Sequence, residues 1–274
     1  MDKKKNDTDV SDQLFQLIGN SYDFLGKPEK AIEAYDEGIK TFPNSGPLHL
    51  EKGNVYYIQK EYNKALTNYE IGIDVDPKFP SNYYRATLLY LNSNDEVWGM
   101  IYGEIFMNLE PSSKRTAEIS KLLFDTYKSE ITFKNDSTAS TSFCKTMTMN
   151  IKTDNSSEIK LPFPMIYEST LIVSVALEKA ITLESLNRIR STFIENYYNA
   201  AHNEKYPNIL FDFQKELKDA GYFEAYNYWI CMKGDEAAFV TWQTENKVAW
   251  DNFISWYSKN RITIDKEHKF SRFQ

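Results

Sequence analysis

Residues 12–45 read DQLFQLIGNSYDFLGKPEKAIEAYDEGIKTFPNS, residues 46–79 read GPLHLEKGNVYYIQKEYNKALTNYEIGIDVDPKF, and residues 80–113 read PSNYYRATLLYLNSNDEVWGMIYGEIFMNLEPSS. These three segments of 34 residues are copies of one pattern. Tyr22, Tyr56 and Tyr90 share one position, and a proline stands near the end of each copy. A fixed period of this length, with small and aromatic residues at constant offsets, is typical of a solenoid built from helical pairs.

Each copy predicts two short amphipathic helices, a helix A followed by a helix B. In the second copy we expect helix A over Gly46–Ile58 and helix B over Glu61–Val75, with a tight turn near Gln59. Apolar residues recur in helix B at nearly helical spacing. Small residues such as Gly53 and Ala65 let the two backbones approach closely, and the proline after each helix B ends that helix.

These residues resemble the tetratricopeptide repeat family, whose pattern asks for a bulky residue, Gly, Tyr, Ala, an aromatic, a small residue and Pro. The first two copies supply it as Phe15, Gly19, Tyr22, Ala31, Tyr35, Gly38 and Pro43, and as Gly53, Tyr56, Ala65, Tyr69, Gly72 and Pro77. The third copy is degenerate, with Thr87, Gly99 and Gly103 in place of Gly, Ala and the aromatic residue. The resemblance covers about 100 of 274 residues. It implies an all-α, right-handed α-α superhelix that binds a protein or peptide partner.

Outside the repeats the sequence predicts more helices and few strands. We expect a polar lead-in over 1–11, the repeats plus a capping helix over 12–130, an irregular linker over 131–160, and a helical region over 161–274. Ser113 is a suitable cap for the helix that ends near Glu130. Residues 143–149 fit either a short helix or a strand. In the C-terminal region the periodicity predicts helices over 164–179, 183–201, 208–220, 223–232 and 235–259.

Composition narrows the class of protein. A net charge of −7 disfavours a nucleic-acid partner, which needs clustered Lys and Arg. No apolar run reaches the length of a membrane span. Two cysteines, Cys144 and Cys231, favour buried free thiols over a single bridge. The charged N-terminus without a following hydrophobic segment predicts a cytoplasmic protein, or a periplasmic or exported one if a signal peptide has been removed. Abundant Asn, Lys, Ile and Tyr suggest a bacterial source.

The resemblance also implies where a partner binds, because helix A residues outside the core line the concave face of such solenoids. The residues we expect to make contact are Gln16, Asn20, Leu50, Asn54, Tyr57, Tyr84, Arg85 and Leu88. Some family members hold a peptide carboxylate with two lysines, two asparagines and an arginine on this face. Asn20 and Arg85 match that clamp, but Gln16, Glu51 and Ser81 replace the other three, so we do not expect carboxylate binding. The alternative is that the C-terminal region of the chain covers part of this face.

Catalytic and metal-binding motifs are absent from the sequence. The three histidines lie far from one another and from the cysteines, and no nucleotide-binding or hydrolase fingerprint occurs. The aromatic residues between Tyr222 and Tyr257 follow helical spacing and predict a core more than a ligand-stacking surface. We therefore expect a non-catalytic scaffold or adaptor with no cofactor and no metal. The rival hypotheses are an enzyme with its site in the C-terminal region and a module that associates with a second copy as a homodimer.

Overall fold

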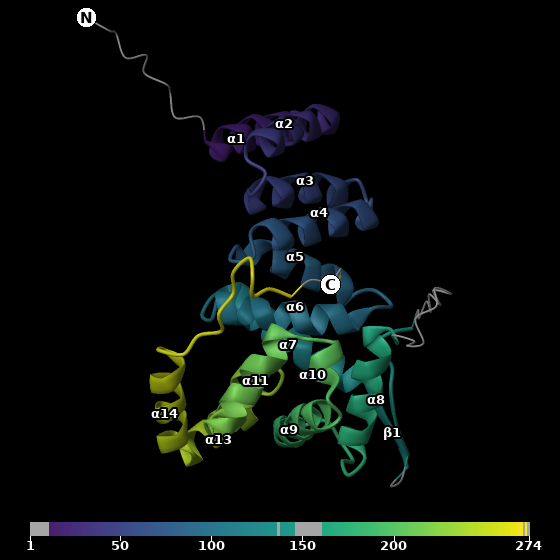
Figure 1. The fold of residues 1–274 in the computed structure, drawn as a ribbon, viewed down its shortest axis with the longest axis vertical. Coiled ribbons are helices and arrows are strands. Elements are labelled where there is room, and N and C mark those ends of the chain that lie inside the picture. The colour runs from purple at the N-terminus through teal and green to yellow at the C-terminus, as the bar shows by residue number, and fades with distance from the viewer. Residues whose placement is uncertain (1–10, 136–137, 146–160, 271, 273–274) are drawn as a thin grey trace, which may run out of the picture. The chain divides into compact units, whose positions relative to one another are not determined.

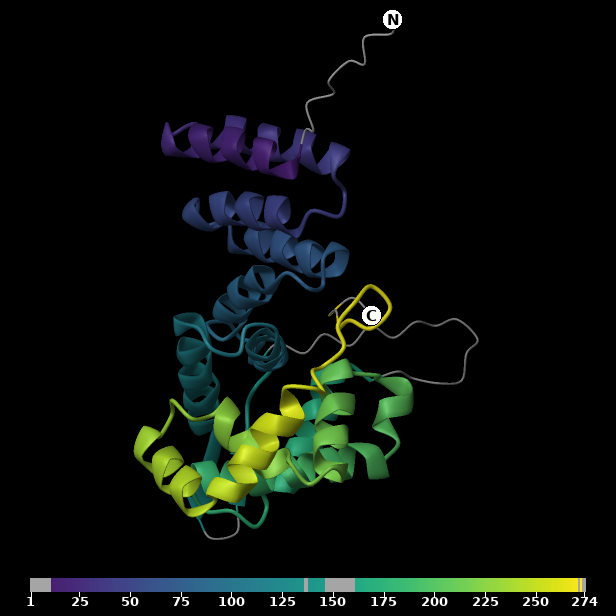
Figure 2. The same cartoon turned by 90° about the vertical axis from the view of Figure 1, so that its left-hand side faces the viewer.

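The computed structural model describes residues 11–135, 138–145, 161–270 and 272 of the chain (Figures 1 and 2). Helices dominate these residues, so the predicted all-α class is confirmed. The chain forms two compact units. The first contains the residues up to Ala86 and the chain end from Ile264, and the second contains Thr87–Thr263. This division differs from the predicted domains, whose boundaries stay a prediction.

The helices of the first unit and the start of the second follow the predicted period. The first unit contains α1 (Asp12–Phe24), α2 (Pro28–Thr41), α3 (Gly46–Ile58) and α4 (Tyr62–Val75), and α5 (Pro80–Tyr90) crosses into the second unit. The second unit continues with α6 (Glu96–Leu109), α7 (Lys114–Glu130), β1 (Ile131–Asn135), β2 (Thr138–Thr141), α8 (Phe163–Val175), α9 (Leu183–Asn199), α10 (His202–Lys205), α11 (Ile209–Asp219), α12 (Phe223–Ile230), α13 (Glu236–Glu245) and α14 (Lys247–Tyr257). Helices α1, α3 and α5 begin at the first residue of each copy.

Close packing of glycine against tyrosine holds each of the first two helical pairs together. A Cβ atom on Gly19 would overlap the ring of Tyr35, and one on Gly53 would overlap the ring of Tyr69. Both tyrosines are fully buried. The glycine in helix A is therefore required because the tyrosine of helix B occupies the space that a side chain would fill.

The third copy reverses this distribution of bulk. Thr87 stands where the first copies have glycine, and Gly103 stands where they have tyrosine. The Cγ2 atom of Thr87 would lie only 3.0 Å from a Cβ atom on Gly103. The two substitutions compensate each other, which explains how a copy that departs from the pattern still forms a helical pair.

The turn between helix A and helix B requires a left-handed residue. Gly26 has φ 68° in the first copy, and Lys60 has φ 61° at the equivalent place in the second. The Lys27 and Glu61 amides that follow donate to the carbonyls of Tyr22 and Tyr56. The first two copies thus close their turns with the same hydrogen bonds.

The tyrosine shared by the three copies has equivalent surroundings in only two of them. The ammonium groups of Lys30 and Lys64 lie 5.8 Å and 5.3 Å from the ring centroids of Tyr22 and Tyr56. Tyr90 is buried and packs instead against Tyr102, with 5.9 Å between ring centroids. The third copy has lost the surface character of this position because α6 is almost entirely buried.

Helix α7 begins where the sequence predicts. The Ser113 side chain accepts a hydrogen bond from the Thr116 amide at 3.1 Å, and the Thr116 hydroxyl accepts one from the Ser113 amide at 3.1 Å. This reciprocal capping satisfies two amides that would otherwise lack partners at the helix N-terminus.

A hairpin follows α7 where the sequence predicted an irregular linker. β1 and β2 pair antiparallel, with Ile131 opposite Thr141 and Phe133 opposite Ala139. The Ser/Thr-rich composition suggested a loop, but β-branched threonine is also suited to strands, and Thr132 hydrogen-bonds Ser140 across the pair at 2.7 Å. Residues 146–160, which are half of the predicted linker and include part of the 143–149 segment, lie outside the described residues, as does the lead-in up to residue 10.

The helices of the C-terminal region begin within one residue of the predicted starts, and the short helix α10 was not predicted. The single helix predicted over 235–259 is two helices that meet at Asn246, whose φ of −111° and ψ of 33° depart from helical values and whose side chain donates to the Trp242 carbonyl at 2.9 Å. Helix α8 ends at Val175, before the predicted end at residue 179, and it packs on α9 and β2 with Val173 exposed.

Aromatic residues form the core of the second unit, as the helical spacing predicts. Phe253 and Tyr226 are buried and in ring contact, and Trp242 stacks on Tyr228 at 4.3 Å between centroids. Within the described residues, no helix is both long enough and apolar enough to cross a bilayer.

Candidate functional site

The predicted contact residues lie on three helices. Gln16 and Asn20 are on α1, Leu50, Asn54 and Tyr57 are on α3, and Tyr84, Arg85 and Leu88 are on α5. Asn20 and Tyr57 are exposed, and the other six are partly buried. Seven of the eight belong to the first unit, whereas Leu88 belongs to the second.

Two of these residues are asparagines held by a tyrosine from the neighbouring helix. The Tyr35 hydroxyl donates to Asn20 Oδ1 at 2.6 Å, and the Tyr69 hydroxyl donates to Asn54 Oδ1 at 3.0 Å. The two pairs are one repeat apart. Because the hydroxyl fixes the amide oxygen, the amide nitrogen of each asparagine has a set direction, and its hydrogen-bond donors are oriented before any partner arrives.

Charged and aromatic side chains gather around the Tyr69 hydroxyl. Burial raises the pKa of Tyr69, Arg85 lowers it, and Tyr57 and Glu51 raise it further. Asn54 also donates to Glu51 Oε2 at 3.1 Å. Asn54 thus contacts both Tyr69 and Glu51, and Tyr57 and Arg85 act on the same hydroxyl through their charge. That these residues bind a partner stays a prediction.

Glu51 also acts on the tyrosine of the preceding repeat. Burial raises the pKa of Tyr35, and the charges of Glu51 and Asp23 raise it as well. The face thus carries two carboxylates near one guanidinium. Glu51 and Asp23 were not among the predicted contact residues. In both repeats the asparagine lies 15 residues before the tyrosine that it contacts, as Asn20 does before Tyr35 and Asn54 before Tyr69. This constant offset could have predicted the two hydroxyl groups on whose pKa Glu51 acts.

Aromatic rings form the apolar part of the face. Tyr57 is 44% exposed and meets Tyr62 edge to face, with 5.6 Å between centroids. The Arg85 guanidinium lies 5.9 Å from the centroid of the Tyr84 ring. Tyrosine and arginine are the side chains that most often anchor protein partners, because they combine a large apolar area with hydrogen-bonding groups.

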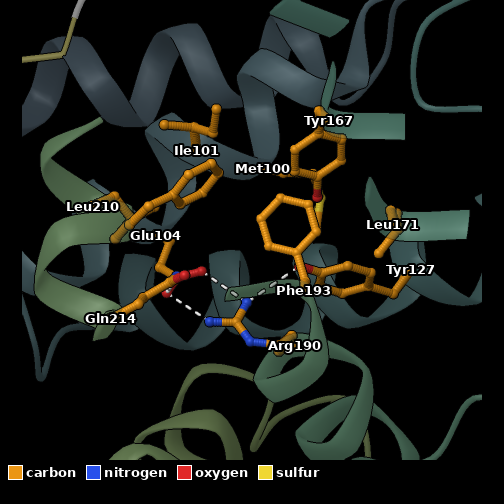
Figure 3. Close-up of a pocket in the computed structure, with 11 residues that line it drawn as sticks. Met100, Ile101, Glu104, Tyr127, Tyr167, Leu171, Arg190, Phe193, Leu210 and Gln214 are labelled. Carbon is orange, nitrogen blue, oxygen red and sulfur yellow. Dashed lines mark hydrogen bonds and ion pairs between the residues drawn. The ribbon is translucent and has the colours of Figure 1, made fainter. Parts of the chain in front are cut away.

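The second unit contains a buried ion pair beside a small cavity. Arg190 on α9 donates to both carboxylate oxygens of Glu104 on α6, at 2.7 Å and 2.8 Å (Figure 3). The same guanidinium donates to the Tyr127 hydroxyl at 3.2 Å and to Asn227 Oδ1 at 2.7 Å. Gln214 donates to Glu104 at 2.5 Å. Helices α6, α7, α9, α11 and α12 are joined through this one network.

The cavity beside this pair has a volume of about 20 Å³ and is lined mainly by aromatic and aliphatic side chains. A space of that size holds about one water molecule and no substrate. Every polar group named in the network has a partner, so the arrangement is what a structural ion pair requires. It gives no support to the enzyme hypothesis for this region.

Both cysteines and one of the three histidines are also buried. Cys144 and Cys231 are free buried thiols, as predicted, and burial raises the pKa of Cys231 to about 12. His49 is buried in α3, and burial lowers its pKa. In the part of the chain that the structure describes, no group of three or more His, Cys, Asp and Glu side chains is arranged to hold a metal ion.

Comparison with known proteins identifies the repeated stretch. A family profile described as "Tetratricopeptide repeat" matches residues 12–45, and another described as "TPR repeat" matches residues 53–93. The chain is 33% identical over 63 residues to "Tetratricopeptide repeat protein 21B" of Mus musculus, and 32% identical over 75 residues to the Homo sapiens protein of that name. These alignments cover 23% and 27% of this chain but only 5% and 6% of the two relatives. Residues 12–45 and 53–93 of the chain are thus assigned to tetratricopeptide repeats.

Proposed function

We propose that the protein is a non-catalytic scaffold or adaptor that binds a protein or peptide segment on the helix A face of its repeats. The observation that carries the proposal is the pair of asparagines held by buried tyrosine hydroxyls, beside the exposed Tyr57. Oriented amides supply hydrogen bonds to an extended backbone, and the rings supply an apolar anchor site. Helices that are already stacked lose little conformational entropy on binding, so modest contacts give useful affinity.

The charges on the face indicate the kind of segment it accepts. Asp23 and Glu51 outnumber Arg85 around the two hydroxyls. A peptide carboxylate would therefore be repelled, in keeping with the missing clamp lysines. We infer that the partner segment carries an apolar or aromatic residue for Tyr57 and Tyr84, and neutral or basic residues next to it.

Selection from a random-peptide display library on the immobilised full chain tests this proposal. The affinity of a selected peptide is then measured by calorimetry for the wild type, Tyr57→Ala and Ile254→Ala. Ile254 is the matched control because, like Tyr57, it is 44% exposed, but it lies on α14 and not on a helix A of the repeats. We expect Tyr57→Ala to weaken binding at least about tenfold, as for an anchor residue, and Ile254→Ala to change it less than about twofold.

Asn54 is a poorer choice for this test. Its removal would leave the buried Tyr69 hydroxyl without its partner, at a cost of about 1–3 kcal/mol in stability. Equal affinities for wild type and Tyr57→Ala, together with unchanged affinity for Arg85→Gln, would show that the selected peptides bind elsewhere and would refute the assignment.

A further inference from the structure

The end of the chain returns to the first unit and docks on helix α4. We call residues 264–272 the C-terminal tail. Lys269 Nζ donates to the Asp74 carbonyl at 2.9 Å and to Asp74 Oδ1 at 2.5 Å. Arg272 donates through Nε and Nη2 to the two carboxylate oxygens of Glu70, each at 3.0 Å. Phe270, between the two basic residues, is buried.

Glu70 gives this contact its selectivity. Glu70 is only 1% exposed, so its carboxylate has lost most of its hydration. A planar guanidinium that meets both oxygens is the best replacement for that water, because two parallel hydrogen bonds form to a full charge. An empty site would leave a buried carboxylate without this partner, which is strongly unfavourable. The site therefore favours being occupied by a cation at all times.

The repeats show that a cation from the tail is not the usual arrangement here. Asp36 holds the place of Glu70 one repeat earlier, and Lys52 of the next helix A pairs with it at 2.5 Å. One repeat after Lys52 the chain has Ala86. Helix α5 thus supplies no charge at that position, and the cation comes from a residue 202 positions away in the sequence.

The tail is built as an extended segment with a preformed bend. Asp265 Oδ1 accepts from the amides of Glu267 and His268 at 2.9 Å and 2.7 Å, and the Asp265 amide donates to the His268 carbonyl at 2.9 Å. This turn precedes Lys269. The described part of the tail contains neither helix nor strand, so it can leave α4 without breaking regular secondary structure.

We propose that Glu70 and Asp74 form a binding site for an extended basic segment of a partner protein. That segment has a lysine and an arginine three residues apart and an aromatic residue between them. The C-terminal tail occupies this site as an internal competitor. Exchange of one cation for another keeps a positive charge beside the buried Glu70 carboxylate throughout. The site is made by α4, a helix B, and is distinct from the helix A residues of the proposed function.

A labelled synthetic peptide of residues 262–274 is the probe. Its binding is measured by fluorescence anisotropy to the full chain and to the full-length double variant Lys269→Ala/Arg272→Ala. In the wild type the tethered tail competes at an effective concentration of about millimolar, so we expect the double variant to bind the peptide at least about tenfold more tightly. Adding Glu70→Gln to the double variant should remove this gain. Lys247→Ala/Lys259→Ala removes the same charge outside the tail and should leave peptide affinity at the wild-type level.

A single variant keeps the proposal testable if the double variant fails to fold. Lys269→Ala alone keeps Arg272 on Glu70 and should give a smaller gain in the same direction. The proposal is overturned if the peptide binds the folded double variant and the wild type equally weakly. It is also overturned if both tail variants lose their far-ultraviolet circular dichroism, because the tail would then be a required part of the fold and not a displaceable occupant.

Discussion

Replacement of Arg190 by methionine is the perturbation whose outcome follows most directly from the structure of the second unit. The Arg190 side chain is 5% exposed and the Glu104 side chain 4%. Methionine keeps much of the length of arginine and its packing but removes every hydrogen bond of the guanidinium. Glu104 would then remain buried with Gln214 as its hydrogen-bond donor in the network. Breaking a buried pair in this way costs about 3–5 kcal/mol in the free energy of unfolding.

Urea unfolding followed by tryptophan fluorescence measures this loss of stability in the second compact unit, which contains the ion pair. All five tryptophans of the chain lie between Thr87 and Thr263, so their emission reports the second unit. Arg188→Met is the matched control on the same helix. Its guanidinium pairs with Glu178 and Glu184, but its side chain is 50% exposed, so the loss should stay below about 1 kcal/mol.

A second substitution separates the cost of a stranded charge from the loss of packing. Glu104→Gln/Arg190→Met removes both charges, and its free energy of unfolding should be about 2 kcal/mol higher than that of Arg190→Met alone. The reasoning fails if Arg190→Met loses less than about 1 kcal/mol, or if the double variant is less stable than the single one.

Three further predictions concern single residues. Burial lowers the pKa of His49 below its unfolded value. The stability that neutral His49 contributes above about pH 6.5 is therefore lost as the pH falls from that value toward the folded pKa. The difference in urea midpoint between wild type and His49→Gln should become smaller as the pH falls, and a constant difference would contradict this. Lys60→Gly should raise the free energy of unfolding by about 1 kcal/mol, because the Lys60 backbone has a left-handed conformation that glycine adopts more easily. Gly26→Ala should lower the free energy of unfolding by a similar amount. Circular dichroism melts that show effects of the opposite sign would argue against backbone strain at this turn. With its pKa raised to about 12, Cys231 should react with iodoacetamide at about pH 8 only after unfolding in urea; peptide mapping that finds it labelled in the native protein would disprove its burial.

The repeat units could be predicted from sequence because their packing is local and periodic. Gly19 and Tyr35, or Gly53 and Tyr69, are 16 residues apart in one helical pair, and the same contact recurs in the next copy. The period of 34 residues therefore fixes the helix starts without knowledge of the rest of the chain. Even the third copy keeps its helices, because the larger Thr87 at the glycine position of helix A faces the smaller Gly103 at the tyrosine position of helix B.

Features that interrupt a continuing sequence pattern, or that depend on distant residues, could not be predicted in this way. The helix breaks at Asn246 although the helical spacing of the aromatic residues continues across this position. The pairing of Arg272 with Glu70 joins residues 202 positions apart in the sequence. A hint was present, because Ala86 holds the place where the previous repeat has Lys52, the residue that pairs with Asp36.

The candidate binding face could be predicted from the sequence only in part. The resemblance located Asn54, Tyr57 and Arg85, and the structure gathers them around the Tyr69 hydroxyl. It did not reveal that this hydroxyl fixes the asparagine, because the repeat pattern asks only for an aromatic ring at this position and not for a hydroxyl. The contribution of Glu51 was interpreted only as a mismatch to a carboxylate clamp. Whether these residues contact a partner stays a prediction.

Hydrogen–deuterium exchange with and without a library-selected peptide tests the central claim most directly. If the helix A face binds the segment, amides of α3 and α5 should exchange more slowly in the complex, while α9 and α12 of the second unit keep the rates they have in the free protein. Protection confined to the second unit, or no protection of α3 and α5 at saturating peptide, would contradict the account.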